Sequence, residues 1–78
     1  NFIELSPEYG LVDVDLPRGW AGHTIRDLDI RAKYKVNVIA VRRGSDFHVS
    51  PGADWIMIEG DKLVVLGADS DIAALCKR

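Results

Sequence analysis

Three side chains that lie close together in the sequence are of types suited to ligand recognition: Asp29, Arg31 and Asn37. Arginine presents a planar fork of N–H donors to carboxylate or phosphate oxygens, and the asparagine amide both donates and accepts hydrogen bonds. Asn37 stands among strand-forming residues, where asparagine is uncommon because its amide competes for backbone partners. Strand propensity therefore does not explain why an asparagine stands at position 37. From the residues alone, Asp29 and Arg31 favour an ordinary ion pair near a helix end, which contributes about 0–1 kcal/mol when exposed.

A group of carboxylates offers a second candidate site. Asp13 and Asp15 are two residues apart in an alternating segment, so both point to the same side of a strand. With Asp27 and Asp29 they could supply oxygen ligands to a hard divalent cation. A solvated strand face accounts for the same acids, and nothing in the sequence resembles the loop of an EF-hand. The sequence favours the solvated face.

The remaining reactive side chains do not form a catalytic motif. Cys76 has no histidine close to it in sequence, and His23 and His48 stand too far apart to suggest a metal site. Trp20 and Trp55 are large apolar anchors suited to core or dimer packing. The chain also lacks a glycine-rich phosphate loop and the hydrolase motifs H-E-x-x-H and G-x-S-x-G. The sequence therefore predicts a binding protein and not an enzyme.

The element expected to carry Asp29 and Arg31 is a helix that begins at Thr24. Thr24 and Asp27 form a capping-box-like start, in which the threonine oxygen accepts a backbone hydrogen bond and the acid faces the positive end of the helix. The apolar spacing continues through a second short turn as far as residue 34. The strongest strand pattern follows at once, over residues 36–41, and it is apolar on both faces, as in an interior strand.

The other elements follow from alternation and from turn residues. Residues 11–16 alternate, with Val12, Val14 and Leu16 on one face, and the strand ends at Pro17. Further strands are expected within 46–51, 54–61 and 63–66, and a last helix from Asp69 or Ser70 with Ile72, Leu75 and Cys76 facing inward. The order is β-α-β-β-β-β-α. It predicts a small layered α+β sandwich, with a mostly antiparallel sheet and helices packed against it.

Size and charge narrow the class of protein. A chain of 78 residues forms a single domain and buries only about 60–65% of its unfolded surface. One cysteine allows no internal disulfide, so a symmetric homodimer is the expected stabiliser. The net charge of −2 argues against nucleic acid as a partner, and no apolar run approaches the roughly 18 residues of a membrane span. The lone cysteine suits a reducing compartment, and the missing initial methionine suggests a piece of a longer protein.

Three stretches, taken in order, resemble one known family. They are "VDLPRGWAGHTIRDLDIRAKYKVNVIAVRRG", "SPGADWIMIEGDKLVVLG" and "DSDIAAL". The set is similar to the RCK_C domain, also called TrkA-C, the C-terminal regulatory module of potassium channel and transporter regulators, and most similar to the Ktr-type regulator subunit. The resemblance covers about residues 10–76. It implies that residues 1–10 are a linker from a missing RCK_N nucleotide-binding domain and that residues 11–78 are the RCK_C domain.

The resemblance also implies a ligand and the residues that bind it. In the Ktr-type branch, cyclic di-AMP binds in the cleft between two protomers, through two adjacent apolar residues, then Asp-x-Arg, then Asn followed by two apolar residues. Carried over to this sequence, the pattern falls on Ile25, Arg26, Asp29, Arg31, Asn37, Val38 and Ile39. Arg26 departs from the pattern, because an apolar residue is expected there. Arg31 and Asn37 would donate to a phosphate, Ile25 and Ile39 would contact the purine, and Asp29 would accept from an adenine amine or orient Arg31.

Together these expectations describe a regulatory domain of a bacterial potassium uptake system that binds cyclic di-AMP at a two-fold dimer interface. It would require no cofactor and hold no metal. Its partners would be a second copy, a larger ring in the full-length protein, and a membrane potassium-transporting subunit, which would place it in the cytoplasm at the membrane periphery. The alternative is a dimerisation or divalent-cation-sensing RCK_C module that does not bind nucleotide.

Overall fold

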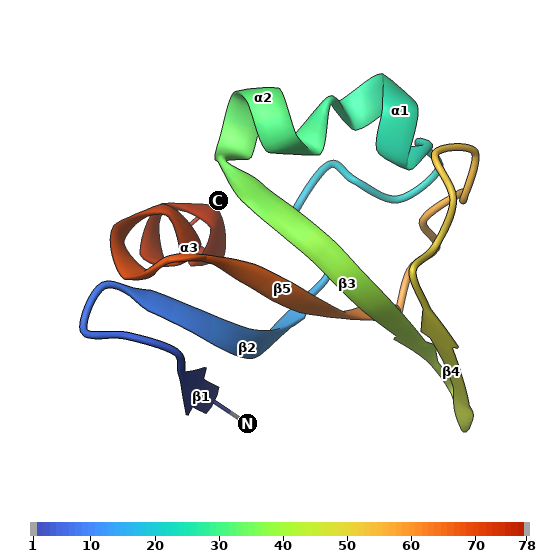
Figure 1. Cartoon of the computed structure of the whole chain (residues 1–78). Coiled ribbons are helices and arrows are strands. Elements are labelled where there is room, and N and C mark those ends of the chain that lie inside the picture. The colour runs from blue at the N-terminus through green and yellow to red at the C-terminus, as the bar shows by residue number, and fades with distance from the viewer. Residues whose placement is uncertain (1, 78) are drawn as a thin grey trace.

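The computed structural model describes residues 2–77 and shows one sheet with helices against it (Figure 1). The strands are β1 (Phe2–Glu4), β2 (Tyr9–Asp15), β3 (Val36–Arg43), β4 (Asp46–Val49) and β5 (Lys62–Ala68). The helices are α1 (Ile25–Leu28), α2 (Ile30–Tyr34) and α3 (Asp69–Cys76). The strands lie in the order β1-β2-β5-β3-β4, and every neighbouring pair is antiparallel. The predicted α+β class is confirmed.

The central strand β5 organises the hydrophobic core. Leu63 pairs with Val14 of β2 on one side and with Val41 of β3 on the other. All three side chains are buried, and they face the helices because alternate residues of a strand share one face. The face predicted for residues 12 and 14 and the interior position of β3 are both confirmed.

Loop residues complete this core. Trp20, in the loop between β2 and α1, is fully buried, and its ring centroid lies 5.1 Å from that of Tyr34 at the end of α2. Met57, in the loop between β4 and β5, is buried to the same degree. From α3, Ile72 and Leu75 reach the same cluster, whereas Cys76 is exposed. The inward position predicted for Cys76 is therefore wrong, and α3 begins without a side-chain cap.

Three other predictions about the elements differ from the structure. Residues 2–4, for which no strand was expected, form an edge strand paired with β2. The segment within 54–61 forms no strand of the sheet. It makes an isolated bridge, Thr24 with Ile56, between turns at 53–54 and 59–60, and its backbone bonds to the segment before α1. Strand β5 does not stop at Gly67. A Cβ atom there would lie 2.8 Å from Cγ1 of Val36, so glycine permits the close approach of β3.

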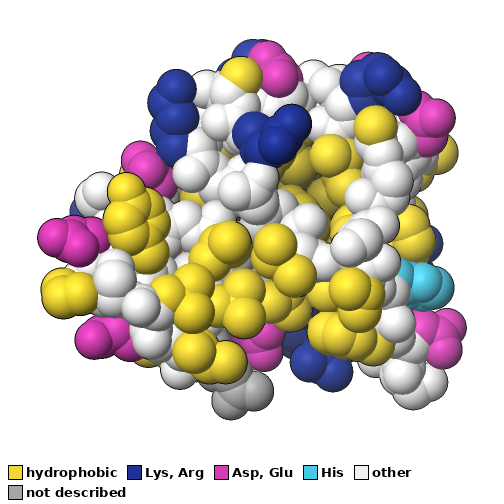
Figure 2. All heavy atoms as spheres, viewed as in Figure 1, with side chains coloured by type: hydrophobic (Ala, Val, Ile, Leu, Met, Phe, Trp, Pro, Cys, Tyr) yellow, Lys and Arg dark blue, Asp and Glu magenta, His cyan; other side chains and the backbone are white. Residues whose placement is uncertain are grey.

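Within residues 2–77, no helix covers the opposite face of the sheet (Figure 1). Ile3, Leu11, Leu66 and Asn37 lie directly opposite one another across β1, β2, β5 and β3, and therefore point to the same face. Figure 2 shows hydrophobic side chains gathered over β2, β5 and β3. We call this the outer face. None of the helices within residues 2–77 is long and apolar enough to cross a membrane.

Candidate ligand groove

The start of α1 is fixed by its cap and by the loop opposite it. Thr24 Oγ1 accepts a hydrogen bond of 3.0 Å from the backbone N–H of Asp27, which confirms the predicted helix start. The next two backbone N–H groups, those of Ile25 and Arg26, donate to the carbonyls of Trp55 and Ala53 at 3.1 and 2.9 Å. Because these N–H groups have no partner within a short helix, the loop supplies it. The loop between β4 and β5 therefore sets the position of α1.

Asp29 forms the junction between α1 and α2. Its backbone is left-handed, with φ 49° and ψ 50°, and it is both the last capping residue of α1 and the first of α2. Its N–H donates to the carbonyl of Arg26, and its own carbonyl accepts from Lys33. Aspartate is one of the few residue types that adopt this conformation readily. Asp29 thus separates α1 from α2, and the two helices follow each other along one side of the molecule (Figure 1).

Helix α2 places Arg31 close to the start of β3. Ile30 is buried and anchors the helix to the core, which leaves its neighbour Arg31 exposed. Lys35 ends α2 with a second left-handed backbone, φ 64°, and β3 begins at the next residue. Asn37 is the second residue of β3 and is exposed. Arg31 and Asn37 are thus brought to the same place by one tight turn.

A groove of about 340 Å³ lies where these elements meet. Its lining consists of Ile25, Arg26, Asp29, Ile30, Arg31, Asn37, Val38 and Pro51. Six of the seven residues predicted from the sequence are in this set. Ile39 is not, because the pairing of β3 with β5 shifts by one residue between Val38 and Ala40, and Ile39 falls in that irregularity.

Two lining residues were not predicted from the sequence. Ile30 lies between the predicted Asp29 and Arg31. Because it is apolar, it was expected only on the buried face of the helix. Pro51 comes from the loop after β4, far away in sequence. The Pro51-Gly52 pair predicts a turn, but a turn signal does not say which surface the turn will approach.

The charges in the groove are unevenly compensated. Arg26 forms an ion pair with Asp54, Nη2 to Oδ1 at 3.1 Å, and its Nε donates to the same oxygen at 3.3 Å. Among the described residues, Asp29 and Arg31 form no ion pair with each other, so the ordinary ion pair favoured by the residues alone is not present. The side chains of Arg31 and Asn37 likewise have no hydrogen-bonding partner within residues 2–77. These donors are open to a ligand.

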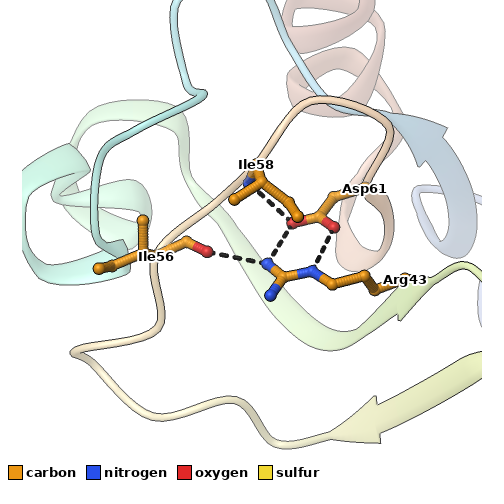
Figure 3. Close-up of polar contacts among 4 residues, drawn as sticks. All are labelled: Arg43, Ile56, Ile58 and Asp61. Atoms are coloured by element: carbon orange, nitrogen blue, oxygen red, sulfur yellow. Dashed lines mark hydrogen bonds and ion pairs between the residues drawn. The ribbon is translucent and has the colours of Figure 1, made fainter.

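A partly buried ion pair, between Arg43 and Asp61, holds the loop that positions α1 (Figure 3). Arg43 of β3 donates through Nε and Nη2 to the two oxygens of Asp61, each at 2.8 Å, and Nη2 also donates to the carbonyl of Ile56 at 2.9 Å. Asp61 further accepts from the N–H of Ile58 at 3.0 Å. The hydrogen bonds from Arg43 lower the pKa of the Asp61 carboxyl, while burial acts in the opposite direction. Arg43 also lies over the ring of Trp55, 4.4 Å from its centroid.

The four acids considered for a cation site do not come together. Asp15 pairs with Lys62 at 2.5 Å on the exposed sheet surface, and Asp29 lies in the groove. Within residues 2–77, no group of three or more His, Cys, Asp or Glu side chains is placed to hold a metal ion. Asp13 and Asp15 line a different hollow, of about 670 Å³, beside the end of α3.

Comparison with known proteins gives a consistent result. The chain is 42% identical over 78 residues to Ktr system potassium uptake protein C of Bacillus subtilis, covering 100% of this chain and 35% of that protein. It is 38% identical over 72 residues to Ktr system potassium uptake protein A of the same organism, covering 92% and 32%. The chain thus spans about a third of the length of these curated relatives.

A solved structure agrees with the sequence comparison. The RCK C domain of the potassium transport protein KtrA, in complex with cyclic di-AMP, superposes with a TM-score of 0.84 at 38% identity, covering 94% of this chain and 86% of that one. The TrkA-C domain family matches residues 11–78. The resemblance noted in the sequence is confirmed, and the chain belongs to the TrkA-C domain family, the regulatory RCK_C domains of potassium transport proteins.

Proposed function

We propose that this domain binds cyclic di-AMP and thereby regulates a bacterial potassium uptake system, with no catalytic role of its own. The observation that carries the proposal is the groove itself. It gathers an open guanidinium, Arg31, an open amide, Asn37, and a carboxylate, Asp29, against apolar walls. The guanidinium and amide suit a phosphate, and a charge-assisted bond to phosphate is about twice as strong as a neutral one. The apolar walls suit a purine.

The ligand site is proposed to be completed by a second copy of the chain. The groove of one protomer lies at the small end of ligand sites, which are about 300–1,000 Å³. Asn37 shares the outer face with Leu11 and Leu66, and Ile3 on the same face is 55% exposed. Covering this face with a two-fold partner would bury those apolar side chains and bring two Asn37 side chains near one axis. Cyclic di-AMP has the same symmetry, with two phosphates and two adenines.

Relatives support the nucleotide and the physiological role. The KtrA domain that superposes on this chain is 38% identical and was solved with cyclic di-AMP. The relatives at 42% and 38% identity are components of Ktr potassium uptake systems. By extension, the full protein is proposed to act in the cytoplasm, at the membrane periphery, through a potassium-transporting subunit. The predicted contact of Ile39 stays a prediction that the groove of one protomer does not include.

Isothermal titration calorimetry of the domain with cyclic di-AMP tests the proposal. We expect saturable binding with one nucleotide for each dimer, and an added free energy of unfolding of about 2.7 kcal/mol when the ligand is at 100 times its Kd. Arg31→Ala and Asn37→Ala should weaken binding at least tenfold, because each removes a phosphate donor. Lys33→Ala, on the same helix but outside the groove, is the control for general loss of positive charge.

Two outcomes would contradict the proposal. Undiminished binding by Arg31→Ala would place the nucleotide elsewhere. No heat with wild-type protein, in a sample that sedimentation shows to be dimeric, would favour the alternative of a dimerisation module without nucleotide.

A further inference from the structure

Arg26 is a lining residue of the groove whose charge does not fit the apolar position it occupies. It is a charged residue where an apolar wall would suit a purine, yet it lines the groove beside Ile25. Both hydrogen bonds of its guanidinium go to one oxygen of Asp54, and its backbone N–H donates to the carbonyl of Ala53. Asp54 itself is not part of the lining. The loop after β4 therefore holds Arg26 by both its backbone and its side chain.

This arrangement separates the two parts of the arginine side chain. Long basic side chains often place their methylene stems on apolar surface while the charged end lies elsewhere. The guanidinium is bonded to Asp54, which does not line the groove, so the stem is the part of Arg26 expected to act as wall. The pair also offsets part of the charge of Arg26, so Arg31 is the arginine of the groove that has no acidic partner within residues 2–77. Both side chains of the pair are well exposed, at 66% and 87%, so the pair is weak and sensitive to salt.

We propose that Asp54 is a positioning residue that sets the charge of the ligand groove by holding the guanidinium of Arg26 away from it. The proposal rests on the proposed binding of cyclic di-AMP. It follows that an anionic nucleotide meets one free guanidinium for each protomer. The wild-type groove therefore binds the nucleotide more weakly than a groove in which Arg26 is released. Releasing Arg26 would add a second free guanidinium for each protomer and would favour any phosphate-bearing ligand.

The test is a double-mutant cycle in the dimeric domain, with the Kd for cyclic di-AMP measured by calorimetry. The variants are Asp54→Asn, Arg26→Met and the two combined. At about 50 mM KCl, Asp54→Asn should tighten binding about three- to tenfold, and the gain should shrink at about 300 mM as screening increases. Arg26→Met removes the guanidinium but keeps an unbranched stem, so it supplies the background without the Arg26 charge for the second half of the cycle. In the Arg26→Met background, Asp54→Asn should change the Kd by less than about twofold.

Asp27→Asn is the matched control, since it removes an exposed acid of the same helix without touching the Arg26 pair. It should leave the Kd within about twofold of wild type. The inference would be overturned if Asp54→Asn tightened cyclic di-AMP binding equally with and without Arg26, or if Asp27→Asn tightened it as much. Either result would mean that binding responds to the net charge of the domain and not to the release of Arg26. A wild-type Kd for Asp54→Asn would also overturn it. Wild-type protein that gives no heat with cyclic di-AMP would instead refute the proposed function, so the two failures are distinguishable.

Discussion

Replacing Asp61 by Asn is expected to lower the free energy of unfolding at pH 7 by about 3 kcal/mol. Asp61 is 2% exposed and accepts two hydrogen bonds from Arg43 and one from the N–H of Ile58. Removing one partner of a buried pair costs about 3–5 kcal/mol when the other charge is left without water. Arg43 is 34% exposed and keeps its bond to the carbonyl of Ile56, so it is partly rehydrated and the lower end applies.

The effect of pH gives the reasoning a second check. The pKa of Asp61 is lower in the folded protein than in the unfolded chain, so the folded state binds fewer protons between the two values. This stabilisation is fully present above the unfolded pKa of about 3.9 and is lost as the pH falls through the folded-state value. The difference in stability between wild type and Asp61→Asn should therefore shrink below about pH 4.

Urea and thermal unfolding between about pH 7 and pH 3 provide the assay. For a domain of this size, 3 kcal/mol corresponds to a fall in Tm of roughly 12–24 °C. Asp15→Asn is the control, because its pair with Lys62 is exposed and solvent screens it; its Tm should change by a few degrees or less. A loss for Asp61→Asn as small as that of the control, or a difference between Asp61→Asn and wild type that does not depend on pH, would refute the reasoning.

Three further variants test other contacts by urea unfolding. Trp20→Ala should cost about 3–5 kcal/mol because it empties a fully buried site; a loss below 1 kcal/mol would show that the surrounding side chains collapse into the space. Thr24→Ala should cost about 1 kcal/mol, since the N–H of Asp27 loses its acceptor, while Thr24→Ser should be close to wild type. Gly67→Ala should cost about 1–3 kcal/mol because its Cβ would meet Val36, and a neutral result would mean that β3 shifts freely.

The main helices and strands could be predicted because the local sequence patterns agree with the way these elements pack in the folded domain. Alternation placed Val12 and Val14 on the core side of β2, and Thr24 marked a helix start that the structure confirms. The segment within 54–61 was misread as a strand because its apolar run, residues 55–58, lies between the turn residues Pro51-Gly52 and Glu59-Gly60. An apolar run between turn residues shows that a segment contributes to a core. It does not show whether the backbone pairs with a sheet.

The groove was predicted in part for the same reason. Arg31 and Asn37 are close in sequence, and a single turn brings them together whatever the rest of the chain does. The loop that carries Pro51 and Asp54 is held against α1 by long-range backbone bonds from the carbonyls of Ala53 and Trp55, for which the local sequence carries no signal. Ile39 lies at a shift of one residue in the pairing of β3, and such a shift has no reliable mark in the sequence.

The left-handed junction at Asp29 also bears on which substitutions are informative. Glycine and asparagine accept such a backbone at little cost, whereas alanine and β-branched residues are strained there. A mutational scan at this position therefore mixes two demands, one conformational and one chemical. Asp29→Asn keeps the turn and removes only the charge, while Asp29→Ala disturbs both. In other chains with this fold, Asn or Gly at this position would keep the left-handed backbone, and so the shape of the groove, but would lack the carboxylate.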